Sequence, residues 1–246
     1  MTVVVDDPLI ASMAIKLPLP LHGSSRRLRE LYPECPRVYG VAVMGDLSRR
    51  RWWPLAEALT ADRLRDMFDS AVTETGNRSS VAQQLTATLS HVVIGRVIPL
   101  LGLEGRAWDT GIENLWVHVD SEGAIDWVGV VDPTLRALPD DPLAAASGIV
   151  ALPSEGALTT WVAHRSHRTL APLFGRLVEV SCGAMSQAAM WHMVGVSVVS
   201  AATQVPMLAG SGELASMRRG QAVLDALVGF GLPVRGETRE LQGRAC

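Results

Sequence analysis

The chain has 246 residues, of which 48% are hydrophobic and 19% are charged. This length can bury a sizeable core and fits one large domain or two small ones. The formal net charge is -3. It argues against a general nucleic-acid-binding surface, because such surfaces carry a strong basic excess.

The sequence indicates a cytoplasmic protein without a transmembrane segment. Its start, Met-Thr-Val-Val-Val-Asp-Asp, lacks the basic region of a secretory signal. Polar side chains interrupt the two most apolar stretches, 89–103 and 184–209, so neither is a clean span of about 20 apolar residues. The three cysteines are far apart and show no zinc, haem or disulfide spacing, which favours a reducing compartment; they are Cys35, Cys182 and Cys246.

The first part of the chain is rich in proline and predicts little regular structure. Residues 1–36 are expected to form an irregular leader that packs on the body, with one short helix near Ser25–Leu31. The apolar run Val38–Met44 favours a strand. A helical segment over Leu55–Val72 is expected to break at Thr60, which can cap a second helix.

A longer helix follows, and one arginine lies inside its apolar stripe. Ser80 and Gln83 have capping-box spacing, and the helix should run to about Leu101 and end at Gly102. Arg96 falls in the middle of the stripe, where a guanidinium must pair with a carboxylate, meet a ligand or snorkel to solvent. Arg96 is therefore a candidate ligand contact. The stripe consists of Val81, Leu85, Leu89, Val92, Val93 and Leu100.

The clearest local pattern is a hairpin over 115–131, in which two β-rich runs flank a polar turn that ends at Gly123. Residues 132–156 are rich in Pro, Ala and Asp and are expected to be mostly connection. Helical periodicity then predicts helices over Thr159–Val180, around Trp191–Val205 and over Glu213–Phe230. The expected class is α+β, with a mostly helical C-terminal half and a small antiparallel sheet. Residues 37–246 would form one domain, with a possible subdivision near 132–156.

Several familiar catalytic motifs are absent. The sequence has no dinucleotide or phosphate loop, no Gly-x-Ser-x-Gly and no His-Glu-x-x-His. His164 and His167 are spaced to face one metal ion on a helix, although a solvated surface pair is the more common arrangement. Arg165, Arg168 and Arg176 share a helix face, which could hold an anionic ligand or be an ordinary solvated face.

The layout of residues 50–246 resembles the FhuF-like ferric-siderophore reductases. The resemblance lies in a Ser-capped helix ending in Ile-Pro-Leu-Leu, a two-stranded segment, the helix that carries Trp191, a Leu-rich helix and the closing run Arg-Ala-Cys246. It implies a pocket for a small molecule such as a ferric siderophore. Candidate ligand contacts are Arg96, His164, Arg165, Arg168 and Trp191.

In that family a pair of adjacent cysteines and a following Cys-x-x-Cys hold a 2Fe-2S cluster that reduces the bound iron(III). Only Cys246 matches a family ligand, so it is the single metal-ligand candidate. The cysteines present do not support the implied 2Fe-2S cofactor, and the cofactor is unknown. The cluster motif is either truncated or lost.

Three functions therefore stay open: a ferric-siderophore reductase, a binding protein on the same fold, and an enzyme of specialised metabolism that uses His or Asp as acid–base groups. The sequence does not indicate a catalytic residue or an oligomeric state.

The three cysteines generate a first prediction. A 2Fe-2S centre needs four protein ligands, usually thiolates, and no Cys-x-x-Cys is present to organise them. We expect the 246-residue chain to purify without stoichiometric iron and sulfide and without reductase activity of its own. Elemental analysis and visible absorption spectra test this. Anaerobic reconstitution of about two irons and two sulfides per chain, with Cys246 required, would contradict it.

Overall fold

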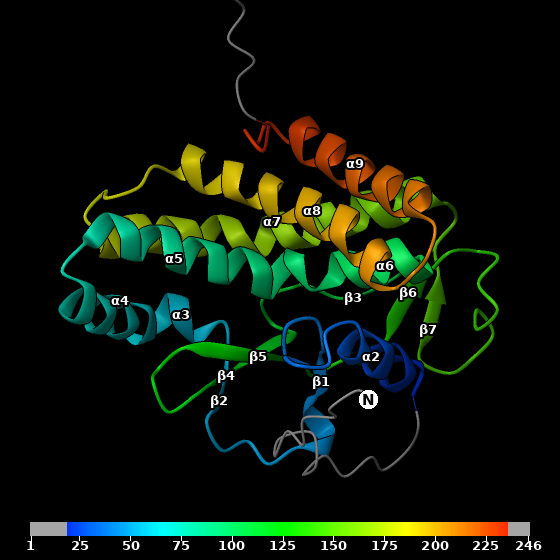
Figure 1. Ribbon diagram of the computed structural model, residues 1–246, viewed down its shortest axis with the longest axis horizontal. Helices are drawn as coiled ribbons and strands as arrows, with labels where there is room; N and C mark the ends of the chain where they lie inside the picture. The colour runs from blue at the N-terminus through cyan, green and yellow to red at the C-terminus, as the bar shows by residue number, and fades with distance from the viewer. Residues whose placement is uncertain (1–18, 236–246) are drawn as a thin grey trace, which may run out of the picture.

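The computed structural model describes residues 19–235, in which a helical layer packs on two small sheets (Figure 1). This arrangement confirms the α+β class and the mostly helical C-terminal half. Residues 1–18 and 236–246 lie outside the described part, so half of the predicted leader and Cys246 are not placed. The helices are α2 (Pro20–Glu30), η1 (Met44–Asp46), α3 (Glu57–Thr60), α4 (Arg63–Thr75), α5 (Arg78–Ser90), the π-helical turn η2 (His91–Gly95), α6 (Val97–Glu104), α7 (Glu155–Val180), α8 (Gln187–Leu208) and α9 (Glu213–Gly229).

The sheets are mixed, whereas the sequence predicted one antiparallel sheet. The first has the strand order β1-β5-β4-β2, and β1 runs parallel to β5. The second has the order β3-β6-β7, and β6 and β7 lie in the region expected to be connection. Strands of two or three residues carry too little alternation to be recognised. The strands are β1 (Ala42–Val43), β2 (Trp52–Pro54), β3 (Arg106–Trp108), β4 (Leu115–Val119), β5 (Ile125–Val130), β6 (Leu135–Ala137) and β7 (Ile149–Ala151).

The predicted hairpin is confirmed, and it contains a β-bulge that the sequence did not suggest. Strands β4 and β5 pair antiparallel around a turn in which Gly123 has a positive φ of 85°. His118 pairs with Trp127 and Val119 pairs with Ile125, so Asp126 has no partner across the ladder. An extra residue of this kind bends its strand and re-aims its side chain.

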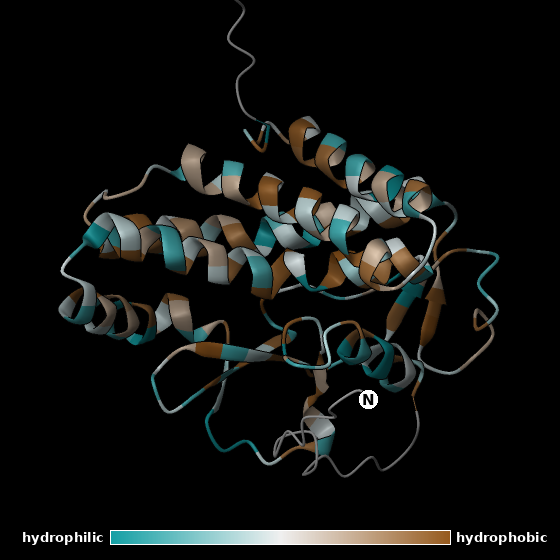
Figure 2. Ribbon diagram, in the orientation of Figure 1, coloured by the Kyte–Doolittle hydropathy of each residue, from teal (hydrophilic) through white to brown (hydrophobic). Residues whose placement is uncertain are grey.

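The three C-terminal helices are confirmed close to their predicted bounds. Ser154 and Ser186 cap α7 and α8 by accepting a hydrogen bond from the backbone N–H three residues on. The predicted apolar stripe of α7 is fully buried; it consists of Val162, Leu170, Leu173, Phe174 and Leu177. In Figure 2, hydrophobic residues dominate the ribbon of α6, whereas α2 is mostly hydrophilic.

The helix that carries Arg96 differs from its prediction at both ends and in the middle. It begins after Asn77, whose side chain caps Ser80 N–H, and it ends at Gly105, which has a φ of 63°. Between α5 and α6 the helix widens into the π turn, where Arg96 N–H bonds the His91 carbonyl five residues back at 3.0 Å. Pro99 explains why the helix yields here, because it cannot donate a hydrogen bond to Gly95 four residues earlier.

The N-terminal elements also differ from expectation. The short helix predicted near Ser25 starts earlier, at Pro20, and buries Leu21 and Leu28 in the main core. Over the predicted strand Val38–Met44 only Ala42 and Val43 pair with β5. Thr60 ends α3 and does not cap the next helix, because α4 begins after Asp62.

Two helical segments are apolar and long enough to cross a membrane by length and composition. They are Arg78–Glu104, which is mostly buried inside the protein, and α8, which is about half buried. Buried core helices have the same composition, so neither is a clear transmembrane span within the described residues.

His91 in the π turn generates a pH prediction. Burial, together with the charge of Arg96, lowers the pKa of His91 to about 4, although its Nε2 donates to the Val38 carbonyl at 2.7 Å. The pKa is lower in the folded than in the unfolded state, so the unfolded chain takes up more protons between about pH 6.5 and about pH 4. Stability contributed by neutral His91 is present above this window and is lost as the pH falls through it.

Chemical denaturation should therefore show that lowering the pH from about 7 to about 4.5 destabilises the native protein by about 2 to 3 kcal/mol more than a His91→Gln variant. A His192→Gln variant is the matched control, because His192 is exposed on α8. Equal pH dependence in the native protein and the His91→Gln variant would contradict the prediction.

Candidate functional site

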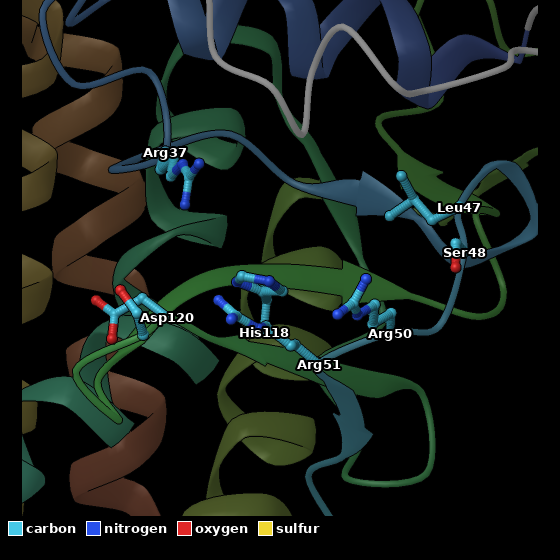
Figure 3. A pocket seen from close by; sticks show the side chains of 8 residues that line it. Arg37, Leu47, Ser48, Arg50, Arg51, His118 and Asp120 are labelled. Carbon is cyan, nitrogen blue, oxygen red and sulfur yellow. The ribbon is translucent and has the colours of Figure 1, made fainter.

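A polar pocket of about 570 Å³ opens at the end of the β4–β5 hairpin (Figure 3). Its walls come from three segments: the stretch after α2, the loop between η1 and β2, and β4 with its turn. Arginines dominate its charged groups. The lining residues are Arg37, Leu47, Ser48, Arg50, Arg51, His118, Asp120 and Ser121.

Two of these arginines have no partner among residues 19–235. The side chains of Arg50 and Arg51 form no hydrogen bond or ion pair with any residue in 19–235, whereas the preceding Arg49 lies 4.8 Å from the centre of the Trp116 ring. Asp120, the one carboxylate in the lining, accepts hydrogen bonds from the backbone of Glu122 and Ala124 in its own turn. The pocket therefore offers unpaired guanidinium groups, which suit carboxylate or phosphate oxygens.

A strained backbone position holds these side chains at the pocket. Arg51 has a φ of 64°, which costs a residue with a side chain about 1 to 2 kcal/mol. Two hydrogen bonds fix this turn: Trp52 N–H donates to the Arg49 carbonyl and Val119 N–H donates to the Arg51 carbonyl, each at 3.1 Å. Backbone strain that the surrounding structure maintains is frequent at binding sites.

His118 lies at the base of the pocket and is held by Asp126. His118 points to the same face of the sheet as Trp52 and Trp127, its neighbours on β2 and β5, and its ring centre is 5.4 Å from that of Trp52. The Nδ1–H donates to Asp126 Oδ1 at 2.7 Å, and the other carboxylate oxygen of Asp126 accepts from Arg37. The bulge makes this contact possible, because it turns Asp126 toward His118.

Arg96 lies outside the pocket lining and holds Asp126, the residue that orients His118. Arg96 is 3% exposed, in keeping with its place in the middle of the apolar stripe. Its guanidinium bonds two backbone carbonyls, of Gly40 at 2.9 Å and of Asp126 at 3.0 Å, and it does not line the pocket. Burial lowers the pKa of Arg96 to about 10, and the nearby charge of Asp126 opposes that change. The residue predicted as a possible ligand contact thus fixes the bulged residue that orients His118.

The structure does not bring the other predicted site residues to this pocket. Arg165 forms ion pairs with Asp109, at 2.6 Å, and with Glu113, and these bonds raise its pKa. Arg168 is exposed on α7 and has no hydrogen-bond or ion-pair partner among the described residues.

His164 and Trp191 belong to a ring cluster between α7, α8 and the end of α9. The His164 ring is 6.1 Å from Phe230, and His167 is 5.8 Å from Phe230 and 5.7 Å from Trp191. Trp191 is 4% exposed and also packs on Phe174, so it is a core residue. Burial, with His164 and Arg168 nearby, lowers the pKa of His167.

Sequence reasoning missed the pocket residues Arg37, Arg50, Arg51 and His118, together with Asp126. The signals were present as an arginine run before a strand and as a histidine that strand alternation places beside Trp116. Only the pairing of the strands shows that these two segments lie side by side and form a site.

Residues 19–235 contain no group of three or more His, Cys, Asp or Glu side chains that could hold a metal ion. Cys35 and Cys182 are exposed and unpaired, and Cys246 lies outside the described residues. Comparisons with protein-family models, with curated proteins and with solved structures give no match.

The burial of Arg96 generates a stability prediction. Arg96→Met leaves the two carbonyls without a donor, and each unsatisfied buried acceptor costs about 1 to 3 kcal/mol. The substitution leaves no buried carboxylate side chain without a partner, and it removes the cost of burying the guanidinium charge. We therefore expect a loss of about 2 to 3 kcal/mol in the free energy of unfolding.

Urea denaturation measures this loss. Arg218→Met is the control, because Arg218 is exposed and forms no hydrogen bond or ion pair with residues 19–235. An Arg96→Met variant as stable as the native protein would show that the two carbonyl bonds contribute nothing.

Proposed function

We propose that this chain binds a small anionic metabolite in the arginine pocket, and that it does so in the cytoplasm. The observation that carries the proposal is the pair of guanidinium groups, of Arg50 and Arg51, that line the pocket and have no partner among residues 19–235. Arginines that merely face solvent would not require the strained backbone turn at Arg51, and this strain supports a binding role for them. The unpaired, exposed thiols of Cys35 and Cys182 suit a reducing compartment.

The resemblance to FhuF-like reductases supplies the first chemical candidate, a ferric siderophore that presents anionic oxygen atoms around its iron. Guanidinium groups bind such oxygens through charge-assisted hydrogen bonds. Binding of this kind needs no metal ligand from residues 19–235. Reduction of the iron would need an electron donor from elsewhere. We therefore propose that this chain binds the ferric complex, and we do not propose that it reduces the iron.

Isothermal titration with two ferric siderophores of similar size, one an anionic tris-catecholate and the other a cationic hydroxamate, tests the proposal. We expect the native protein to bind the anionic complex and to discriminate against the cationic one. Arg50→Ala should weaken binding of the anionic complex by about tenfold or more, since a hydrogen bond to a charged group contributes about 1.5 to 3 kcal/mol.

Arg51→Gly separates binding from stability. Glycine relieves the positive φ, so the free energy of unfolding should stay equal or rise by up to about 1 kcal/mol, while the affinity falls about tenfold. Arg218→Ala is the matched control for lost positive charge and should bind normally. Unchanged affinity in both pocket variants, or equal binding of the cationic complex, would refute the proposal.

A further inference from the structure

The imidazole of His118 presents one fixed nitrogen and one open nitrogen. Asp126 is a carboxylate acceptor, so the hydrogen bond at 2.7 Å places the proton of neutral His118 on Nδ1 and leaves a lone pair on Nε2. Nε2 forms no hydrogen bond with any described residue, although His118 is only 6% exposed. Nε2 is nevertheless not cut off from solvent, and His118 lines the pocket. A molecule in the pocket can therefore reach Nε2.

We infer that His118 is a general base that activates water, and that the pocket hydrolyses carboxyl esters of small anionic molecules. The inference rests on the proposed anion binding and adds a reaction to it. A carboxylate that holds one imidazole nitrogen fixes the tautomer and stabilises the imidazolium that forms during proton transfer. Asp126 is placed for this task, because Arg37 and Arg96 hold its side chain and its backbone respectively.

The reaction balances with water as the only co-reactant. Nε2 removes a proton from water while the water oxygen attacks the ester carbonyl, which gives a tetrahedral oxyanion. The imidazolium then returns the proton to the leaving oxygen as the C–O bond breaks, so an alcohol and a carboxylic acid form and His118 is regenerated. One of the two unpartnered arginines can bind the anionic group of the substrate while the other stabilises the oxyanion.

The placement of a single base favours an ester of a carboxylic acid over a phosphate ester. In phosphoryl transfer the attacking and leaving oxygens lie in line on opposite sides of phosphorus. One imidazole cannot serve both of these oxygens. In the tetrahedral intermediate of an ester the two oxygens are on the same carbon, within reach of one Nε2. Figure 3 shows one imidazole, that of His118, among the labelled pocket side chains.

The test uses the mono-p-nitrophenyl ester of succinic acid as an anionic ester, p-nitrophenyl acetate as a neutral ester and p-nitrophenyl phosphate. We expect the native protein to hydrolyse the succinate ester with a normal solvent deuterium isotope effect and in preference to the other two. His118→Asn and Asp126→Asn should each lower kcat by about 100-fold or more. His192→Asn, which alters an exposed histidine on α8, should leave it unchanged.

Binding of the matching succinate p-nitroanilide, an amide that resists hydrolysis, separates this inference from the proposed binding. Variants that bind the amide normally but lose turnover support a general base. If the native protein binds the amide and does not hydrolyse the ester, the inference is overturned and anion binding stands. If it binds neither the anionic ferric complex nor the amide, both the inference and the proposed anion binding fail.

Turnover unchanged in His118→Asn, or equal turnover of the phosphate ester, overturns the inference. Because the isotope effect is measured on the native protein, its absence counts against proton transfer even if a variant does not fold.

Discussion

The guanidinium of Arg96 holds the helical layer and the first sheet in one arrangement. It leaves the helix at the end of the π turn and reaches the carbonyls of Gly40 and Asp126 on two separate segments. A buried charge is tolerated only where hydrogen bonds replace its water. The Asp126 carbonyl is available because the bulge leaves this residue without a partner in the strand ladder. The helix with the π turn therefore supplies the hydrogen-bond donor, and the hairpin with the bulge supplies an acceptor for it.

The pocket follows from this arrangement with little additional structure. Once Asp126 is fixed, its carboxylate orients His118 from one side and pairs with Arg37 on the other. Trp52 and Trp127 flank His118 on the sheet and limit its movement. The turn at Arg51 then adds two cations from an exposed loop. Rigid strands thus carry the histidine, while the loop supplies the charge.

The sequence was sufficient for regular elements with long apolar periods and insufficient for the site. Helix α7 and the hairpin could be predicted because their patterns extend over many residues. The burial of Arg96 could be read from the same periodicity. The bulge at Asp126 and the positive φ of Arg51 are set by strand pairing across the sheet, which no local window contains. Arg165 looked available for a ligand because its partners, Asp109 and Glu113, lie in the loop between β3 and β4, far from it in the sequence.

The π turn also has a consequence for how the chain can change. A π turn holds one residue more than the α-helix would place there, and one residue corresponds to a rotation of about 100°. Loss of one residue between His91 and Gly95 would let this turn close into regular α-helix and leave the direction of Arg96 nearly unchanged, because the π turn already absorbs the extra residue. A single-residue deletion within α5 would instead turn Arg96 by about 100° relative to the start of the helix and away from the hairpin, so the number of residues before the π turn matters to the site as much as any side chain.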